Sequence, residues 1–338
     1  MAGLPVITVL GKGVDDRPPH LERLHGRVDV RICDSAGLDS AVPGAQALFL
    51  WDFFSPALRE AWPRCDALRW VHVAAAGVDS LMFPELSASD VVVTNARGVF
   101  DRPIAEYVLG AVLAHAKQTH RSADLQRERV WKHRETRSVR GAVAVVVGTG
   151  AIGRECARLL TAVGMQVRGV GRTARSGDPD FGVVVASSEL AEHMGDVDYL
   201  VVVAPLTDQT RGLIDARVLA ALPPRAHLIN VGRGESVVTA DLIAALSAGH
   251  LDGASLDVVD PEPLPEDSPL WDLPGVRITP HMSGDAQGWL DALALQFVDN
   301  AERWLDGEPL CNVVDTRLGY VSARPERGGD EADTSPLP

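Results

Sequence analysis

Positive charge is scarce in this sequence. Its 338 residues include 32 Lys and Arg against 46 Asp and Glu, which gives a formal net charge of −14. Proteins that hold a nucleic acid by its phosphates usually carry a basic surface, so this balance argues against a nucleic-acid partner. A small anionic substrate is still compatible with it, because a few arginines can converge on one site.

Cysteine is also scarce, and no CxxC or metal-type spacing occurs. The four cysteines are Cys33, Cys65, Cys156 and Cys311. We expect reduced, mostly buried thiols and no metal site. The longest apolar helical run, at 107–116, is shorter than the about 20 residues that a membrane span needs. The N-terminus lacks a basic segment and reads as a first strand. We therefore expect a cytoplasmic protein with no membrane partner.

Short apolar runs alternate with longer stretches of helical periodicity. The runs that favour strands are 6–10, 47–51, 70–74, 91–95, 143–147, 166–170, 199–204, 226–231, 254–258 and 277–279. Such alternation indicates parallel sheets covered by helices on both faces. The pattern occurs before about residue 100 and again after about residue 140, and the chain length suits about two domains. We predict an α/β protein.

Helical patterns also mark the middle and the end of the chain. Residues 105–127 have no obvious breaker, which predicts one long helix joining the two series of strands. A further amphipathic helix is expected after Leu290, ending at Asp306-Gly307. Residues 322–338 are rich in Pro, Gly, Glu and Asp, which is typical of a disordered tail.

A glycine-rich turn, Gly148-Thr-Gly150-Ala-Ile-Gly153, lies between a predicted strand and a predicted helix. In this context the motif is typical of dinucleotide binding. Gly148 permits the tight turn, Gly150 lets the backbone approach a pyrophosphate, and Gly153 lets helix and strand pack closely. The N–H groups at the helix N-terminus would face the phosphate charge.

The second strand of this unit lacks the acidic residue that accepts from the ribose of NAD. Gly171-Arg172-Thr173 stands there instead, with Arg175 nearby. Arg172 can pair with a 2′-phosphate and Thr173 can donate a hydrogen bond to it, so we favour NADP(H) over NAD(H). The alternative is an Arg172 that stacks on adenine at the surface without selecting a phosphate.

Three candidate catalytic residues, Arg233, Glu262 and His281, each follow a predicted strand. In an open parallel sheet, ligands bind beyond the carboxyl ends of the strands. Reduction of a 2-oxo acid needs a proton on the carbonyl oxygen, which a histidine can supply near neutral pH. Glu262 would fix the tautomer of His281, and Arg233 would hold the substrate carboxylate. Arg97 is a second cation that either faces this site or is solvated.

With these motifs the sequence resembles the D-isomer-specific 2-hydroxyacid dehydrogenase family, over nearly its whole length to about Tyr320. Other matching segments are Val231-Gly-Arg233-Gly, Leu256-Asp257-Val and Asp260-Pro-Glu262-Pro. The segments Leu48-Phe-Leu-Trp51 and Ala74-Ala-Ala-Gly77-Val-Asp79 resemble the branch of NADP-using glyoxylate/hydroxypyruvate reductases. The resemblance implies a hydride passed from a nicotinamide to a small 2-oxo acid, with a D-2-hydroxy acid as product.

The resemblance also implies a domain plan and a homodimer. Two Rossmann-like or flavodoxin-like domains are expected, with a nucleotide-binding domain (101–287) inserted in a substrate domain (1–100 and 288–320). Backbone N–H groups of Ala76 and Gly77 would bind the substrate carboxylate, and Trp51 would pack beside a small side chain. Asp257 would contact the nicotinamide carboxamide. The expected cofactor site comprises Gly148, Gly150, Ala151, Ile152, Gly153, Arg172, Thr173, Ala204, Pro205, Thr210, Val231, Gly232, Asp257, Ser283 and Gly284.

Two alternatives keep this fold. One is a different substrate: phosphite, formate or a 2-oxo acid that bears a phosphonate. Glu262 beside the histidine argues against formate, and the lack of Lys in the 74–77 loop argues against phosphite. Arg97 would serve the phosphonate. The other alternative is a dinucleotide-sensing binding protein of the corepressor type, which the acidic charge disfavours.

Overall fold

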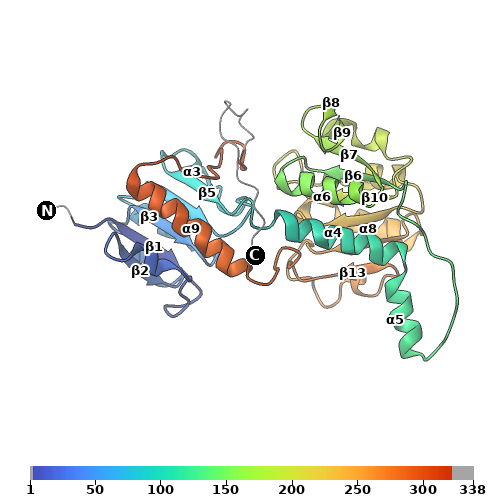
Figure 1. Ribbon diagram of the computed structural model, residues 1–338, viewed down its shortest axis with the longest axis horizontal. Coiled ribbons are helices and arrows are strands. Elements are labelled where there is room, and N and C mark those ends of the chain that lie inside the picture. Colours follow the sequence, from blue (N-terminus) through green and yellow to red (C-terminus); the bar gives the residue numbers. More distant parts are fainter. Residues whose placement is uncertain (1–2, 322–338) are drawn as a thin grey trace.

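The computed structural model describes residues 3–321, so the predicted disordered tail at 322–338 lies outside the described residues. Figure 1 shows two lobes side by side, each built on one sheet. All strand pairs are parallel except one at the edge of the second sheet. The predicted α/β class with parallel sheets is confirmed.

The first lobe contains a five-stranded sheet in the order β2-β1-β3-β4-β5. Its strands are β1 (Val6–Leu10), β2 (Asp29–Cys33), β3 (Ala47–Leu50), β4 (Trp70–Val73) and β5 (Val92–Asn95). Its helices are α1 (Leu38–Ala41), α2 (Ala57–Ala61), α3 (Pro84–Ser87) and α9 (Trp289–Asp306). This flavodoxin-like order reverses between β1 and β3, and ligands bind at such a switch point.

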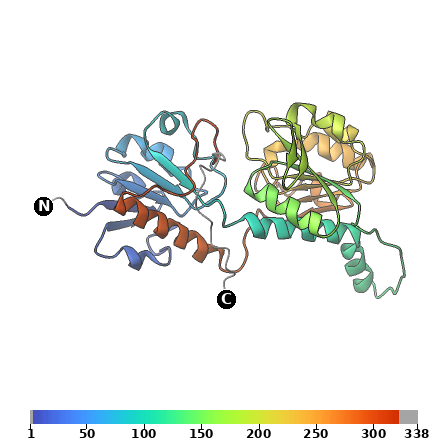
Figure 2. The ribbon, with the colours of Figure 1, turned by 45° about the horizontal axis from the view of Figure 1, so that its top comes forward.

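Helix α9 comes from the end of the described chain and lies on this first sheet (Figure 2). Its Phe297 stacks on Phe49 of β3, with ring centroids 3.9 Å apart, and on Trp70 of β4 at 5.5 Å. The helix ends where expected, because Gly307 takes the left-handed conformation that closes it.

The second lobe contains an eight-stranded sheet in the order β13-β12-β11-β10-β6-β7-β9-β8. Its strands are β6 (Val143–Val147), β7 (Gln166–Gly171), β8 (Arg175–Asp178), β9 (Gly182–Ala186), β10 (Tyr199–Val202), β11 (His227–Asn230), β12 (Gly253–Leu256) and β13 (Val276–Ile278). Its helices include α6 (Ala151–Ala162), α7 (Ala216–Ala221) and α8 (Thr239–Ser247). The order reverses at β6, which pairs with both β7 and β10.

Short 3-10 helices complete the two lobes. They span Leu21–Leu24, Trp62–Arg64, Ser187–His193, Gly234–Ser236 and Pro269–Trp271. No helix among residues 3–321 is both long enough and apolar enough to cross a membrane.

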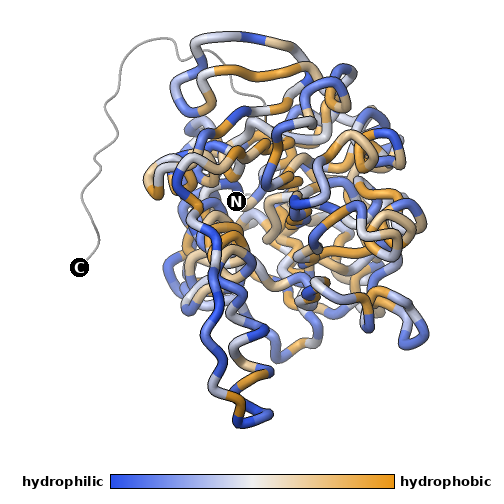
Figure 3. The backbone as a smooth tube through the Cα atoms, turned by 90° about the vertical axis from the view of Figure 1, so that its right-hand side faces the viewer, coloured by the Kyte–Doolittle hydropathy of each residue, from blue (hydrophilic) through white to orange (hydrophobic). Residues whose placement is uncertain are grey.

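The prediction of one long helix over 105–127 is wrong. The structure has α4 (Asp101–Ala116) and α5 (Thr119–Arg127), separated where Gln118 adopts a left-handed φ of 51°. Arg134 donates to the side-chain and backbone oxygens of Gln118, so contacts distant in sequence fix the break. We call α5 with residues 128–138 the arm. It projects from the second lobe and is largely hydrophilic (Figure 3).

Candidate active site

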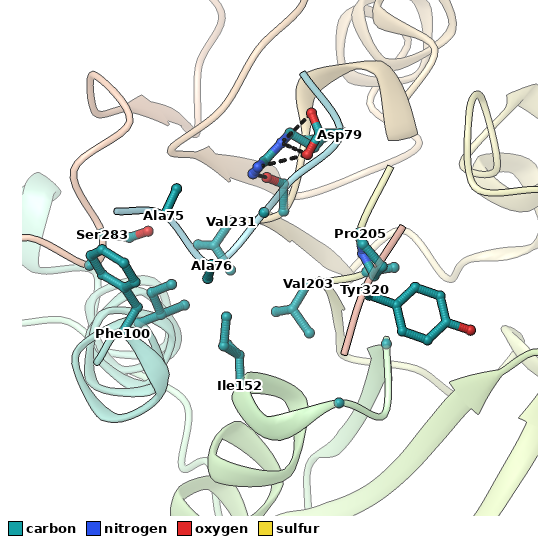
Figure 4. Close-up of a pocket in the computed structure, with 18 of the residues that line it drawn as sticks. Ala75, Ala76, Asp79, Phe100, Ile152, Val203, Pro205, Val231, Ser283 and Tyr320 are labelled. Atoms are coloured by element: carbon teal, nitrogen blue, oxygen red, sulfur yellow. Dashed lines mark hydrogen bonds and ion pairs between the residues drawn. The ribbon is translucent and has the colours of Figure 1, made fainter. Parts of the chain in front are cut away.

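A cleft of about 1860 Å³ lies between the lobes and is lined by residues of both. Ligand pockets commonly measure about 300–1,000 Å³, so this cleft has room for a dinucleotide and a small acid together. Figure 4 shows loops of the first lobe facing the helix start at Ile152 and the strand ends at Val203 and Val231. Every predicted catalytic, substrate-binding and cofactor-binding residue lines this one cleft.

The glycine-rich turn between β6 and α6 has the shape that a pyrophosphate needs. Gly148 has a φ of 111°, and a side chain there would press on the backbone N of Ala204 at 2.8 Å. A side chain at Gly153 would overlap the carbonyl oxygen of Gly148. Space beside Gly150 is open, so the backbone can approach a ligand closely. The residues present therefore fit a dinucleotide.

The first N–H groups of α6 strengthen this fit. The helix begins at Ala151, directly after Gly150, and the N–H of Arg154 donates to the carbonyl oxygen of Gly150. The N–H groups of Ala151 and Ile152 therefore point beyond the helix start, where they and the helix dipole favour an anion.

Cationic side chains gather at the far end of β7. Arg172 lies directly after the strand, with its guanidinium carbon 5.4 Å from the ring centroid of Tyr320. Arg175 binds Asp178 through Nε and Nη2, while its Nη1 lies near Gly171. The pKa of Asp178 is held far below its usual range, first by Arg154 and then by Arg175, against the opposing effect of burial. Arg175 is thus paired with an ionised carboxylate, whereas Arg172 forms no ion pair among the described residues.

His281 and Glu262 form the pair expected from the sequence. His281 Nδ1 lies 2.9 Å from Glu262 Oε2, and the N–H of Val259 donates to Glu262 Oε1 at 3.1 Å. Burial raises the pKa of Glu262, but the hydrogen bonds from His281 and Val259 and the charge of Arg233 outweigh it. The net effect is a lowered pKa and an ionised carboxylate, to which Nδ1–H donates. The Nε2 atom of His281 is left for a substrate.

Asp257 anchors the loop that carries His281. Its buried carboxylate accepts from Thr279 Oγ1 at 2.5 Å and from the N–H groups of Met282 at 3.0 Å and Ser283 at 2.9 Å. Its carbonyl oxygen accepts from the N–H of His281. His281 itself has a φ of 53°, so these contacts hold the residue in a conformation that side chains rarely adopt. The partners that a buried carboxylate requires are therefore provided by this loop.

Arg233 pairs across the cleft with Asp79, a residue that sequence reasoning did not assign to the site. Nε of Arg233 lies 3.1 and 3.2 Å from the two carboxylate oxygens, and Nη2 lies 2.9 Å from Oδ1 (Figure 4). Nη1 donates to the carbonyl oxygen of Gly232 at 2.8 Å. The signal was present, because Asp79 stands two residues after the predicted substrate loop at 76–77.

These contacts leave one edge of the Arg233 guanidinium unused. Asp79 takes the edge formed by Nε and Nη2, and the carbonyl oxygen of Gly232 accepts from Nη1. Nη1 and Nη2 each keep one further hydrogen, and together they form the end of the group. This end matches the two oxygens of a carboxylate.

The loop after β4 adds backbone donors beside that edge. A side chain at Gly77 would collide with Nη2 of Arg233, so only glycine lets the loop come this close. Asn95 Nδ2 donates to the carbonyl oxygen of Ala76 at 2.6 Å and fixes the loop. Among the described residues, no acceptor is found for the N–H groups of Ala76 and Gly77. These N–H groups remain available to a ligand.

Trp51 and Arg97 reach the cleft differently. Trp51 is only 8% exposed, and its Nε1 donates to Asp16 at 3.1 Å, so it forms a fixed wall. Arg97 is half-buried, and its backbone oxygen accepts from Gln296 and Asn312. Within residues 3–321 its guanidinium forms no ion pair, although Asp101 lies close enough to feel its charge.

Comparison with known proteins gives a consistent result. Residues 109–283 match the family model described as the NAD-binding domain of D-isomer specific 2-hydroxyacid dehydrogenases. The chain is 31% identical over 260 residues to glyoxylate/hydroxypyruvate reductase A of Salmonella choleraesuis strain SC-B67. That alignment covers 75% of this chain and 82% of the relative.

Solved structures with the same two-lobed architecture extend the match. A D-isomer specific 2-hydroxyacid dehydrogenase of Xanthobacter autotrophicus Py2, solved with NADPH and MES, is 33% identical with a TM-score of 0.80. An NADPH-dependent glyoxylate/hydroxypyruvate reductase of Sinorhizobium meliloti, solved with NADP and sulfate, is 29% identical with a TM-score of 0.78. Each match covers 94% of this chain and 100% of the other.

Proposed function

Because this chain belongs to the D-isomer specific 2-hydroxyacid dehydrogenase family and is an NAD(P)-dependent dehydrogenase, we propose that it reduces a glyoxylate- or hydroxypyruvate-like 2-oxo acid to the D-2-hydroxy acid, with NADPH preferred. The observation that carries this proposal is the convergence of Arg233, Glu262 and His281 on one cleft beside a dinucleotide-binding turn. When bound, the nicotinamide supplies the hydride that is added to the carbonyl carbon.

Arg233 and the loop at Ala76 and Gly77 bind the substrate carboxylate in this proposal. The free end of the guanidinium offers two parallel N–H groups, and the loop offers backbone N–H groups beside it. Asp79 orients the guanidinium and keeps its positive charge partly balanced before the substrate arrives. The carboxylate is thereby fixed with its neighbouring carbonyl inside the cleft.

His281 moves the proton. With Nδ1–H donated to Glu262, the protonated ring carries its second proton on Nε2 and gives it to the carbonyl oxygen as negative charge develops there. The ionised Glu262 accepts from Nδ1–H and fixes the orientation of the ring. In the reverse direction Nε2 accepts the proton of the hydroxyl group.

We favour NADPH because of the charge at the end of β7. Arg172 follows the strand directly, and Nη1 of Arg175 lies close by, where a 2′-phosphate would be placed by the dinucleotide turn. Tyr320 packs against Arg172 and limits the directions that the guanidinium can take. Relatives solved with NADP or NADPH support the same preference.

We also propose a homodimer formed through the arm. Trp131 lies on the arm with its side chain fully exposed, at 102%, and Val130 beside it is 45% exposed. A solvent-exposed tryptophan on a projecting segment is typical of an anchor that is buried in a partner subunit. A cytoplasmic location is part of the proposal, because four unpaired cysteines suit a reducing compartment.

Nicotinamide absorbance tests the proposal. Purified protein is mixed with glyoxylate or hydroxypyruvate and either NADPH or NADH, and the product is resolved on a chiral column. We expect acid-dependent oxidation that is faster with NADPH, and the D-hydroxy acid as product. Absence of oxidation with every 2-oxo acid, although NADPH binds, would contradict the proposed reaction.

Arg97 favours a second candidate substrate. Arg97 lines the cleft, and its guanidinium has no ion-pair partner in the described part of the chain, so it suits a second anionic group. A 2-oxo acid with a phosphonate tail would use it. Phosphonopyruvate therefore belongs in the same assay, and its preference over hydroxypyruvate would favour this candidate.

A further inference from the structure

A row of aromatic side chains begins at His281 and is not used by the chemistry above. The ring centroid of Phe54 lies 5.9 Å from that of His281, at an interplanar angle of 79°. Phe53 follows at 4.5 Å from Phe54, and Trp289 lies 6.3 Å from Phe53. Phe100 continues the row at 6.0 Å from Trp289. All four line the cleft. We call Phe53, Phe54, Trp289 and Phe100 the aromatic row.

The row is uncovered at the end that faces His281. Phe54 is 65% exposed, whereas Phe100 at the far end is 8% exposed. Leu290, next to Trp289, also lines the cleft and is 45% exposed. Single exposed apolar side chains are ordinary on protein surfaces, but a contiguous apolar surface inside a cleft marks a place that a ligand covers.

The row comes from segments that the fold holds firmly. Phe53 and Phe54 follow β3 at the switch point of the first sheet, and Trp289 opens α9. A side chain at Gly284 would meet the Phe100 ring at 2.7 Å, so the loop after His281 packs directly against the row. The position of the row relative to His281 is therefore set by the fold.

We propose that the aromatic row binds the side chain of the 2-oxo acid, so that the substrates extend beyond glyoxylate and hydroxypyruvate to 2-oxo acids with an apolar or aromatic side chain, which are reduced faster. The inference rests on the proposed function, in which Arg233 holds the carboxylate and His281 meets the carbonyl oxygen. The third substituent of that carbonyl carbon is the side chain of the acid, which must then lie near His281. Phe54 is the apolar ring beside it.

Two carboxylates that line the cleft beside the row disfavour a negative side chain there. Asp52 directly precedes Phe53, and Asp285 directly follows Gly284. Asp285 lies close enough to Asp257 and His281 to feel both charges. A negative group on the substrate side chain would be repelled here, whereas methylene or phenyl groups would cover the exposed ring.

The test measures kcat/KM with NADPH for pyruvate, 2-oxobutanoate, 2-oxopentanoate and phenylpyruvate. In the wild type we expect an increase of about fourfold for each added methylene, as apolar burial provides, and phenylpyruvate at least about tenfold above pyruvate. Phe54→Ala should lower the phenylpyruvate-to-pyruvate ratio about tenfold, and Phe54→Leu should restore part of it. Val183→Ala is the control, because Val183 is 48% exposed and does not line the cleft.

The ratio separates a specificity role from a loss of folding, since misfolding lowers kcat/KM for both acids equally. A ratio unchanged by Phe54→Ala, or a fall of kcat/KM with side-chain length in the wild type, would overturn the inference while leaving the proposed reaction intact. Turnover that rises only with phosphonopyruvate would assign the side-chain contact to Arg97 instead. Absence of oxidation of every acid would refute the proposed function itself.

Discussion

Arg233 is held on two sides by protein groups, so its side chain is already ordered before the substrate binds. Asp79 lies on the first lobe and Arg233 on the second, so their ion pair also spans the cleft. Both side chains are about a quarter exposed, which leaves the pair only partly screened by water. Replacing Asp79 should therefore affect the substrate carboxylate without touching the cofactor.

Asp79→Asn is expected to raise KM for the 2-oxo acid about tenfold or more, because the guanidinium loses a charge-assisted partner. Cofactor affinity, measured by fluorescence titration with NADPH, should change less than about twofold. Glu85→Gln serves as the control, since Glu85 is an exposed carboxylate on α3 away from the cleft. An unchanged KM would show that Arg233 does not need Asp79.

We propose that Arg172 determines the preference for NADPH over NADH. Arg172→Gln should raise KM for NADPH about tenfold or more, while KM for NADH changes less than about twofold, because only NADPH carries the 2′-phosphate. Arg168→Gln on β7 is the control, as Arg168 pairs with Asp196 and lies outside the cleft. Equal effects on both nucleotides would support the alternative in which Arg172 only stacks on adenine.

The catalytic residues could be predicted from the sequence because each follows a buried strand whose carboxyl end must lie at the cleft. The ion pair of Asp79 could not be predicted, since Arg233 is more than a hundred residues away, although the place of Asp79 two residues after the substrate loop is a signal that it lies near the site. The same holds for Phe54, whose contact with His281 arises only when the two lobes are brought together.

At the scale of elements, three strands escaped the sequence analysis. β2 carries Asp29 and Arg31, and β8 consists of Arg175-Ser-Gly-Asp178, so neither shows an apolar run. β9 is apolar but pairs antiparallel with β8 at the edge of the sheet, outside the expected alternation of strand and helix. Edge strands are partly exposed and leave weaker patterns than buried central strands.

The interior strand β4 contains a buried histidine with consequences for stability. His72 Nδ1 lies 2.8 Å from Thr94 Oγ1, and no partner for Nε2 is found among the described residues. Burial lowers the pKa of His72 to about 3. The unfolded chain binds a proton below about pH 6.5 and the folded chain does not, so stability is lost as pH falls from about 6.5 toward 3.

His72→Asn removes this titration. The free energy of unfolding in urea, followed by tryptophan fluorescence at pH 7 and pH 5, gives the size of the effect. Between these pH values we expect the wild type to lose about 2 kcal/mol more than the variant, from the linkage of the shifted pKa. Equal losses in the two proteins would show that His72 is not the group responsible.

At the scale of the whole molecule, the site residues lie in the cleft between two parallel sheets. In each sheet, apolar strands alternate with helices along the sequence. Local patterns predicted both sheets, the helices between their strands and the end of α9. The break at Gln118 and the projection of the arm depend on contacts with residues 134 and 137, which no helical periodicity reveals. The proposed dimer likewise rests on the exposure of the Trp131 side chain.

Sedimentation velocity tests the proposed dimer. The wild type should sediment as two copies of the 36.1 kDa chain. Trp131→Glu should weaken association about thirtyfold or more, as expected for an aromatic anchor at the centre of an interface. Val183→Glu, which also replaces an exposed apolar residue, should leave the dimer intact. A monomeric wild type, or a dimer unaffected by Trp131→Glu, would contradict assembly through the arm.

The central claim is that His281, held by Glu262 and facing a bound carboxylate, transfers the proton in an NADPH-dependent reduction. The most direct measurement compares NADPH oxidation by the wild type and by His281→Ala with the same 2-oxo acid, alongside the affinity of each protein for NADPH. We predict that His281→Ala lowers turnover about 100-fold or more and leaves the affinity for NADPH unchanged within about twofold. Retained turnover, or loss of NADPH binding together with turnover, would contradict it.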